Sequence, residues 1–327
     1  MTSPNPVTRS WLWWTLLAVA CWGVWALLAR WIGDALSPGQ QQAISTLGIL
    51  PVLAMLACSR HLGPPGRSRR GALLALASGV LTCLGNLAYY EVLNRGPKEA
   101  MVVPLTALYP LVTVLLAVLF LREHLRPVQR WGILLSLGAI YFFNVQEDGS
   151  FLTSWLWVAL VPILLWGVAA LLQKIATQEL SGERTTLWFL AAFIPVAGFL
   201  MLREPVRSMP SGRTWLLVLL LGFAFALGNF ALLVAYARQG KASVITPLAG
   251  LYPLVSIPLA MVLLGERLSR RETAGILLAL AAVLASALLL LLGRESPELA
   301  LAGWLIGFVY TAAIAIGSSV RYSPKPL

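Results

Sequence analysis

The sequence predicts an all-α, polytopic membrane protein made of two inverted five-helix repeats, ten transmembrane helices in total, with an eleventh C-terminal helix. Three observations predict this fold class. Of the 327 residues, 59% are apolar and 11% are charged, whereas soluble domains average roughly 45–50% and about 25%. The apolar residues form runs long enough to cross a bilayer as helices. One long segment also recurs later in the chain, which indicates an internal duplication.

The apolar runs are separated by short connections that are rich in Gly, Pro and charged residues and too short to hold a soluble domain. A helix of about 20 residues spans the hydrocarbon core of a bilayer. The first run is longer than the apolar core of a signal peptide, and many runs follow it, so we interpret it as a retained span. The predicted membrane helices lie at 11–32, 41–58, 71–94, 99–121, 128–145, 153–174, 185–202, 213–237, 242–264, 273–293 and 299–319.

The net charge of +11 comes from basic residues that stand singly or in short clusters between the apolar runs. They form no patch interleaved with exposed aromatics, so we expect them to set the membrane topology and not to bind nucleic acid. In the first half, Lys and Arg concentrate in alternate connections, which predicts a cytoplasmic N-terminus. Two histidines and three cysteines form no ligand pattern, so the sequence predicts neither a metal site nor a cofactor.

The duplication relates residues 85–125 to residues 228–268 at a constant offset of 143 (228 − 85). A Trp-Gly pair opens each half, at Trp22 and at Trp166. Each copy crosses the membrane five times, so the second copy enters with the opposite orientation, as in many secondary transporters. The alternative is that the duplication only doubled a stable bundle. The predicted organisation is a cytoplasmic tail at 1–10, repeats at 11–147 and 148–294, and an added helix with its tail at 295–327.

The third predicted span carries the densest polar set inside an apolar run. Asn86, Tyr90 and Asn94 recur every four residues and share one helix face, which lines either a cavity or a hydrogen-bonded helix interface. Glu91 is either a proton-coupling or cation-binding group or an interfacial acid. The eighth span keeps one of these asparagines and gains a tyrosine, so we expect an asymmetric cavity. The candidate cavity residues are Trp22, Asn86, Tyr90, Glu91, Asn94, Trp166, Asn229 and Tyr236.

Prolines occupy the fourth and ninth predicted spans. A proline removes a backbone N–H and bends a helix, and in a bilayer the freed carbonyls need protein or water partners. We interpret these prolines as kinks or hinges around a cavity, with static packing as the alternative. They are Pro104, Pro110, Pro247 and Pro253. Glu123 and Glu266 end the same spans and are predicted to anchor loops through salt bridges.

The pattern Pro-Leu-x-x-Leu-Tyr-Pro-Leu-Val at 104–112 and at 247–255, with a glutamate at each helix end and a Trp-Gly pair opening each half, resembles the EamA repeat of the drug/metabolite transporter superfamily. The resemblance covers residues 11–293. It implies a ten-helix carrier that moves small metabolites or drug-like solutes across the inner membrane without ATP, and export is the expected direction. The chain has no G-x-x-x-x-G-K-[ST] phosphate loop.

Two other functional classes remain open at this point. A lipid-linked carrier or flippase would require a lateral opening and a basic headgroup site. An intramembrane enzyme would require a nucleophile with a base, a metal site or paired acids, and the spans contain no such set. The expected partners are a small-molecule substrate, the lipid bilayer and a second copy of the chain in a homodimer.

The last apolar run, at 299–319, carries no formal charge and is long enough to span about 30 Å. Its glycines and alanines offer small faces for packing on another helix. It lacks the strongly polar face of an interfacial helix. We therefore predict an eleventh transmembrane helix that places the C-terminus outside, opposite the N-terminus.

Overall fold

The computed structural model describes residues 10–59, 68–94, 99–121, 154–206, 210–239 and 242–265, together with Leu277. All the regular structure of these residues is helical. The first half holds α1 (Ser10–Ile32), the 3-10 turn η2 (Gly33–Ala35), α2 (Pro38–Ala57), α3 (Arg69–Asn94), α4 (Glu99–Thr106) and α5 (Tyr109–Leu121). The second half holds α7 (Ser154–Glu179), α8 (Gly182–Ala191), α9 (Phe193–Arg203), α10 (Gly212–Gln239), α11 (Ala242–Ala249) and α12 (Pro253–Leu263).

Seven segments of the described residues are long and apolar enough to cross a membrane. They are Trp11–Ala35, Pro38–Ala57, Arg69–Asn94, Val102–Phe120, Leu156–Glu179, Gly182–Arg203 and Gly212–Arg238. These segments follow the spans that the sequence predicts there, while Pro253–Leu263 is a shorter apolar helix. The predicted helices at 128–145, 273–293 and 299–319 lie outside the described residues.

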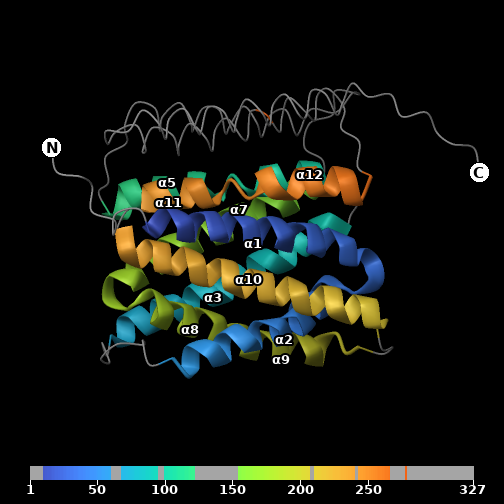
Figure 1. Cartoon of the computed structure of the whole chain (residues 1–327), viewed down its shortest axis with the longest axis horizontal. Coiled ribbons are helices and arrows are strands. Elements are labelled where there is room, and N and C mark those ends of the chain that lie inside the picture. The colour runs from blue at the N-terminus through green and yellow to red at the C-terminus, as the bar shows by residue number, and fades with distance from the viewer. Residues whose placement is uncertain are drawn as a thin grey trace, which may run out of the picture.

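The helices lie roughly along one direction and stack in three layers (Figure 1). One outer layer holds α5, α11 and α12, the middle holds α1, α7, α10 and α3, and the other outer layer holds α2, α8 and α9. The helices of the middle layer make the most extensive contacts, α1 with α10 and α3 with α7. Each of these pairs joins the first helix of one half to the third helix of the other half.

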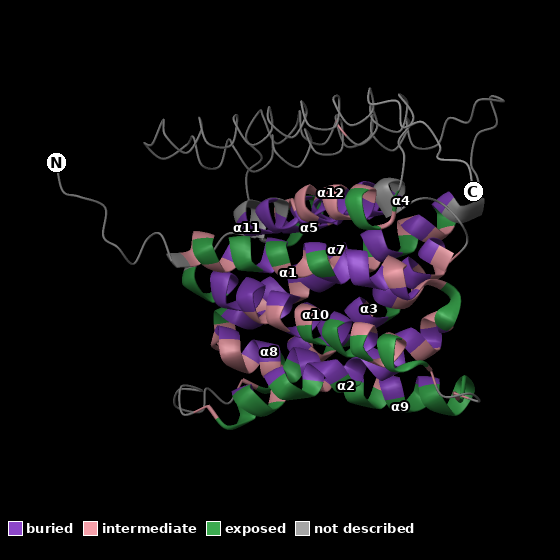
Figure 2. Cartoon of the chain, turned by 45° about the vertical axis from the view of Figure 1, so that its right-hand side comes forward, coloured by how far each residue is buried: buried purple, intermediate pink, exposed green. Residues whose placement is uncertain are grey.

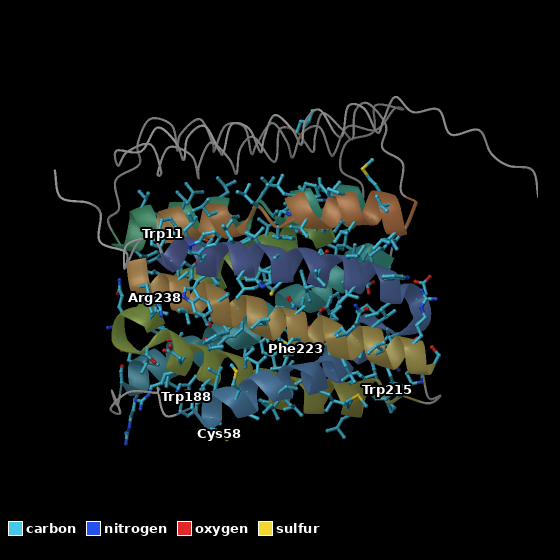
Figure 3. The ribbon with its side chains drawn as sticks, in the orientation of Figure 1. Trp11, Cys58, Trp188, Trp215, Phe223 and Arg238 are labelled. Atoms are coloured by element: carbon cyan, nitrogen blue, oxygen red, sulfur yellow. The ribbon has the colours of Figure 1, made fainter. Side chains whose placement is uncertain are left out.

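Helices α1 and α10 run antiparallel. The Arg238 guanidinium, near the end of α10, lies 5.6 Å from the ring centre of Trp14, near the start of α1. At the other end, Arg213 lies 5.5 Å from the ring centre of Trp31. In Figure 3, Trp11 and Arg238 accordingly lie at one end of the molecule and Trp215 at the other.

Helices α3 and α7 form the second antiparallel pair. Ser68, just before α3, donates a hydrogen bond from its hydroxyl to Glu179, the last residue of α7. Arg70 forms an ion pair with the same carboxylate at 3.3 Å. The start of α3 therefore lies beside the end of α7.

The contacts between the outer and middle layers also occur in repeat-related pairs, α1 with α12 and α7 with α5. A Cβ added at Gly23 would lie 2.7 Å from Cγ1 of Val255, and one added at Gly167 would lie 2.8 Å from Cγ1 of Val112. Because no larger residue fits without a shift, glycine at both positions lets the first helix of each half approach the broken helix of the other half.

The spans that the sequence predicts at 99–121 and 242–264 are each two helices. At both breaks the backbone bonding changes from the α-helical spacing of four residues to a spacing of three. Pro110 and Pro253 follow these turns and have no N–H with which to continue the preceding helix. The repeated Leu-Tyr-Pro motif thus ends one helix and begins the next.

The outer faces of the described helices are apolar. Large exposed side chains include Trp13, Leu119, Leu202 and Val262, each more than two-thirds exposed at 71%, 71%, 85% and 79%. Figure 2 shows exposed residues on the outward faces of the helices and buried residues between the layers. An apolar exterior of this extent is characteristic of a protein whose surface is covered by lipid.

Candidate functional site

A cavity lies between the two repeats in the middle layer. Its volume of about 50 Å³ leaves room for a few water molecules, each of which needs about 10–15 Å³, and none for a drug-sized solute. Among the described residues that line it, none carries a charge. The lining residues are Trp22, Trp25, Thr82, Asn86, Tyr109, Trp166, Ala170, Gln173, Phe225, Asn229, Leu232 and Tyr252.

Half of this lining consists of repeat-related pairs that keep the same residue type. The two tryptophans of the Trp-Gly pairs, the two asparagines of the third helix of each half, and the two tyrosines of the Leu-Tyr-Pro motifs all take part. The duplicated motifs therefore converge on one space between the halves. The pairs differ, however, in how their polar atoms are bonded.

Trp166 is held firmly in its wall of the cavity. Its indole Nε1 donates a hydrogen bond to Oδ1 of Asn86 at 3.2 Å. Three aromatic rings surround it, with centroid separations of 5.9 Å to Trp25, 5.5 Å to Tyr89 and 6.2 Å to Tyr109. Such ring contacts add to the stabilisation from burial alone. Trp166 is therefore part of a rigid aromatic wall.

Trp22, the counterpart of Trp166, is held much less firmly. Its ring contacts Tyr252 edge to face at 6.3 Å. Its Nε1 is buried and has no hydrogen-bond partner among the described residues. Asn229, which corresponds to Asn86, instead donates from its amide to the carbonyl of Phe225 within α10, at 2.9 Å. The Trp–Asn bond thus exists on one side of the cavity only.

The two motif tyrosines differ in the same way. The Tyr252 hydroxyl lies 3.3 Å from Oγ1 of Thr106 and donates to the carbonyl of Val103 at 3.4 Å, both on α4. The Tyr109 hydroxyl is buried without a partner in the described part of the chain. The repeat counterpart of Thr106 is Ala249, which has no hydroxyl to offer.

The structure places four of the sequence-selected candidates in the lining, namely Trp22, Asn86, Trp166 and Asn229. Tyr90 lies behind the wall, where its hydroxyl accepts from Nε1 of Trp25 at 3.2 Å. Tyr236 is buried away from the lining, and its hydroxyl lies 2.6 Å from Oγ1 of Thr246. These two tyrosines support neighbouring helices and do not face the cavity.

The remaining candidates lie elsewhere. Glu91 and Asn94 are half-buried near the end of α3 and are not among the lining residues. Glu123 and Glu266 lie outside the described residues. Prolines 104 and 247 lie within α4 and α11, whereas prolines 110 and 253 lie at the start of α5 and α12.

Several lining residues were not selected from the sequence. Trp25 follows Trp22 by three residues, and Gln173 follows Trp166 by seven, so each shares a helix face with a selected tryptophan. That spacing was the signal that could have found them. Tyr109 and Tyr252 belong to the repeated motif, whose proline predicted a kink but not the direction in which the tyrosines point.

Comparison with known families decides the class of protein. The model of the EamA-like transporter family matches residues 9–145 and, a second time, residues 153–288. The chain belongs to the EamA-like transporter family. It is a multi-pass membrane transporter with two EamA repeats, and the cavity lies between those repeats.

Two relatives extend this comparison. A protein named riboflavin transporter, from Rhizobium johnstonii, is 29% identical over 238 residues, which cover 71% of this EamA transporter and 76% of the relative. An uncharacterised protein of Methanocaldococcus jannaschii is 28% identical over 132 residues, which cover 40% of this chain and 94% of the relative. The second match spans about the length of one repeat.

A solved crystal structure is among those that share this fold. It superposes with a TM-score of 0.65 and covers 88% of this chain and 99% of the other, at 19% sequence identity. At that identity the likeness concerns the fold alone.

Proposed function

We propose that this EamA transporter is a secondary carrier, and that its substrate is a small, uncharged, flat aromatic solute such as riboflavin. The observation that carries the proposal is the chemistry of the cavity between the repeats. Six of its twelve lining residues are aromatic and three are carboxamides. Aromatic faces bind flat rings, and carboxamides bind the carbonyls and ring nitrogens at their edges. The riboflavin transporter relative supports this substrate class.

The uncharged lining also argues against ionic substrates. Moving an isolated ion out of water into an apolar site costs far more than moving a neutral polar group. Riboflavin carries no charge at neutral pH, whereas its phosphate ester carries a phosphate that the described lining has no cation to pair with. The carrier should therefore discriminate between the two molecules.

Alternating access between inverted repeats is the proposed mechanism. Arg30, near the end of α1, donates to the carbonyl of Leu93 near the end of α3, so these two helices run in the same direction. Because α3 and α7 are antiparallel, the repeat-related helices α1 and α7 run in opposite directions. This geometry and the exchanged contacts between halves support two similar units that rock around a shared site. Pro110 and Pro253 are the proposed hinges.

Export is the proposed direction, and a lipid-linked carrier is the competing member of the same superfamily. A flippase would need basic side chains to bind a headgroup, and the described lining has none. The intramembrane enzyme is disfavoured because the matching family and the named relative are transporters.

Uptake into proteoliposomes tests the proposal. Purified carrier reconstituted without ATP should take up radiolabelled riboflavin faster than protein-free liposomes. Excess unlabelled riboflavin should compete, and riboflavin 5′-phosphate should not. Equal uptake with and without the protein, or equal competition by the phosphate ester, would contradict the proposed substrate class. Inside-out vesicles that accumulate riboflavin would support export.

A further inference from the structure

We propose that Trp22 and Tyr109 are the residues that recognise the substrate, and that Trp22 is the side chain that moves to admit it. The indole N–H of Trp22 would donate to a carbonyl or ring nitrogen at the edge of a flat ring. The Tyr109 hydroxyl would bond to a second polar atom of the same solute. This inference rests on the proposed carrier function and assigns its specificity to two residues.

The first argument is that both groups are buried and unpaired. Neither Nε1 of Trp22 nor the hydroxyl of Tyr109 has a hydrogen-bond partner among the described residues. A buried polar group without a partner is costly, and native proteins keep few of them. Both residues line the same cavity. A solute that supplies the missing bonds would relieve this cost, which gives it a binding advantage over a ring without polar edges.

The second argument is that the repeat counterparts are already bonded. Trp166 donates to Asn86 at 3.2 Å, and Tyr252 donates to Val103 at 3.4 Å. In the second repeat, the polar groups of these residues therefore bond within the protein. In the first repeat, the equivalent groups remain available to a solute. This difference in hydrogen bonding assigns a structural role to Trp166 and Tyr252 and a recognition role to Trp22 and Tyr109.

The third argument concerns the mobility of Trp22. Trp166 contacts the rings of Trp25 and Tyr89, and the residues at the repeat-equivalent positions are Ala169 and Leu232, which have no rings. Without counterparts of these two ring contacts and without a hydrogen bond, the Trp22 ring has fewer restraints on its rotation. The cavity of about 50 Å³ must expand to hold a flat solute. Displacement of Trp22 breaks no hydrogen bond, whereas displacement of Trp166 would break its bond to Asn86.

The repeat supplies matched controls for the test. We would measure riboflavin affinity and the midpoint of thermal unfolding, Tm, for purified wild-type carrier and for W22F, W166F, Y109F and Y252F. Y109F and Y252F remove only a hydroxyl, whereas W22F and W166F remove the indole N–H together with part of the ring, so each tryptophan variant is compared with the other. W22F and Y109F should each weaken riboflavin binding about tenfold, the effect of one lost hydrogen bond to a neutral group. The Tm of Y109F should stay the same or rise, because a buried unpaired group has gone, and W22F should lower the Tm less than W166F does.

Compared with W22F and Y109F, the variants W166F and Y252F should show a larger decrease in Tm and a smaller loss of riboflavin affinity. Equal affinity losses in W22F and W166F would overturn the inference while leaving the proposed function in place. A lower Tm for W22F at unchanged affinity would overturn it as well. If the wild-type carrier bound neither riboflavin nor lumichrome, the same ring system without the ribityl chain, both the proposed function and the inference would fail.

Discussion

At the scale of single residues, the two repeats differ in one interhelical hydrogen bond that can be tested directly. Thr113 on α5 donates from Oγ1 to the carbonyl of Gly167 on α7, at 3.0 Å. Its counterpart Ser256 on α12 is buried, and its hydroxyl has no partner in the described residues. The interface of α5 with α7 therefore has a bond that the interface of α1 with α12 lacks.

We predict that T113V lowers the free energy of unfolding by about 0.6–1 kcal/mol, the usual range for a hydrogen bond between membrane helices. S256A should leave it within about 0.5 kcal/mol or raise it, because no bond is lost. Unfolding of both variants in a graded detergent series measures the difference. A larger loss for S256A than for T113V would contradict the assignment of these bonds.

The glycines that pack against the two cavity tryptophans give a second prediction at the scale of single residues. A Cβ added at Gly85 would lie 2.5 Å from Nε1 of Trp166, and one added at Gly228 would lie 2.6 Å from Cδ1 of Trp22. Overpacking a fixed group typically costs about 1–3 kcal/mol. Because Trp166 is bonded and Trp22 is not, G85A should lower the Tm more than G228A. The reverse order would show that Trp22 is the more restrained ring.

Only part of this site could be predicted from the sequence. Asn86 and Asn229 stand out because amides are costly in an apolar run, and the tryptophans stand out by size. Whether a given indole N–H is hydrogen-bonded depends on how a side chain from another helix is oriented, as Asn86 is toward Trp166. Those neighbours are set by tertiary packing, which hydropathy and spacing do not determine.

At the scale of helices, one end of the molecule has a connection between repeats that the second copy lacks. Glu179 at the end of α7 binds Ser68 and Arg70 at the start of α3. The counterpart of Glu179 is Ala35, and the hydroxyl of Ser211, which corresponds to Ser68, lies 3.0 Å from Oγ1 of Thr214 on its own helix. The repeat-equivalent position thus has no carboxylate, although a different one, Glu204 after α9, accepts a hydrogen bond from the hydroxyl of Ser37 before α2.

We predict that E179Q opens the cavity more often toward the end where α3 begins. A cysteine at the lining position Thr82, in a background without native cysteines, reports this opening by its reaction with a membrane-impermeant maleimide added on that side. E179Q should react faster than the parent protein, and S211A should react at the parent rate. Identical rates in all three proteins would rule out Glu179 as a fastening residue.

The helix boundaries were largely predictable, but the broken helices were not. The runs at 99–121 and 242–264 are continuous in hydropathy, so the sequence predicts one helix from each. The structure divides them because a proline follows a three-residue turn at Pro110 and Pro253. Proline within a membrane span predicts a kink, and the change to a complete break depends on contacts made with the other repeat.

At the scale of the whole molecule, the predicted topology can be tested with reporter fusions. The eleventh helix expected at 299–319 lies outside them. We expect a reporter that is active only outside the cytoplasm to be active when fused after Leu327 and inactive when fused after Arg294. This result follows from a cytoplasmic N-terminus and a spanning final segment. Inactivity of the fusion after Leu327, with a cytoplasmic signal at both positions, would show that the segment does not span.

The central claim is that two repeats alternate around one shared cavity to carry a neutral aromatic solute. Counterflow tests it most directly. Proteoliposomes loaded with unlabelled riboflavin are diluted into a trace of labelled riboflavin, without ATP or an ion gradient. The account predicts that label accumulates transiently inside above its external concentration, because each carrier exchanges one bound molecule per cycle. Simple equilibration at the same rate with and without internal riboflavin would contradict alternating access.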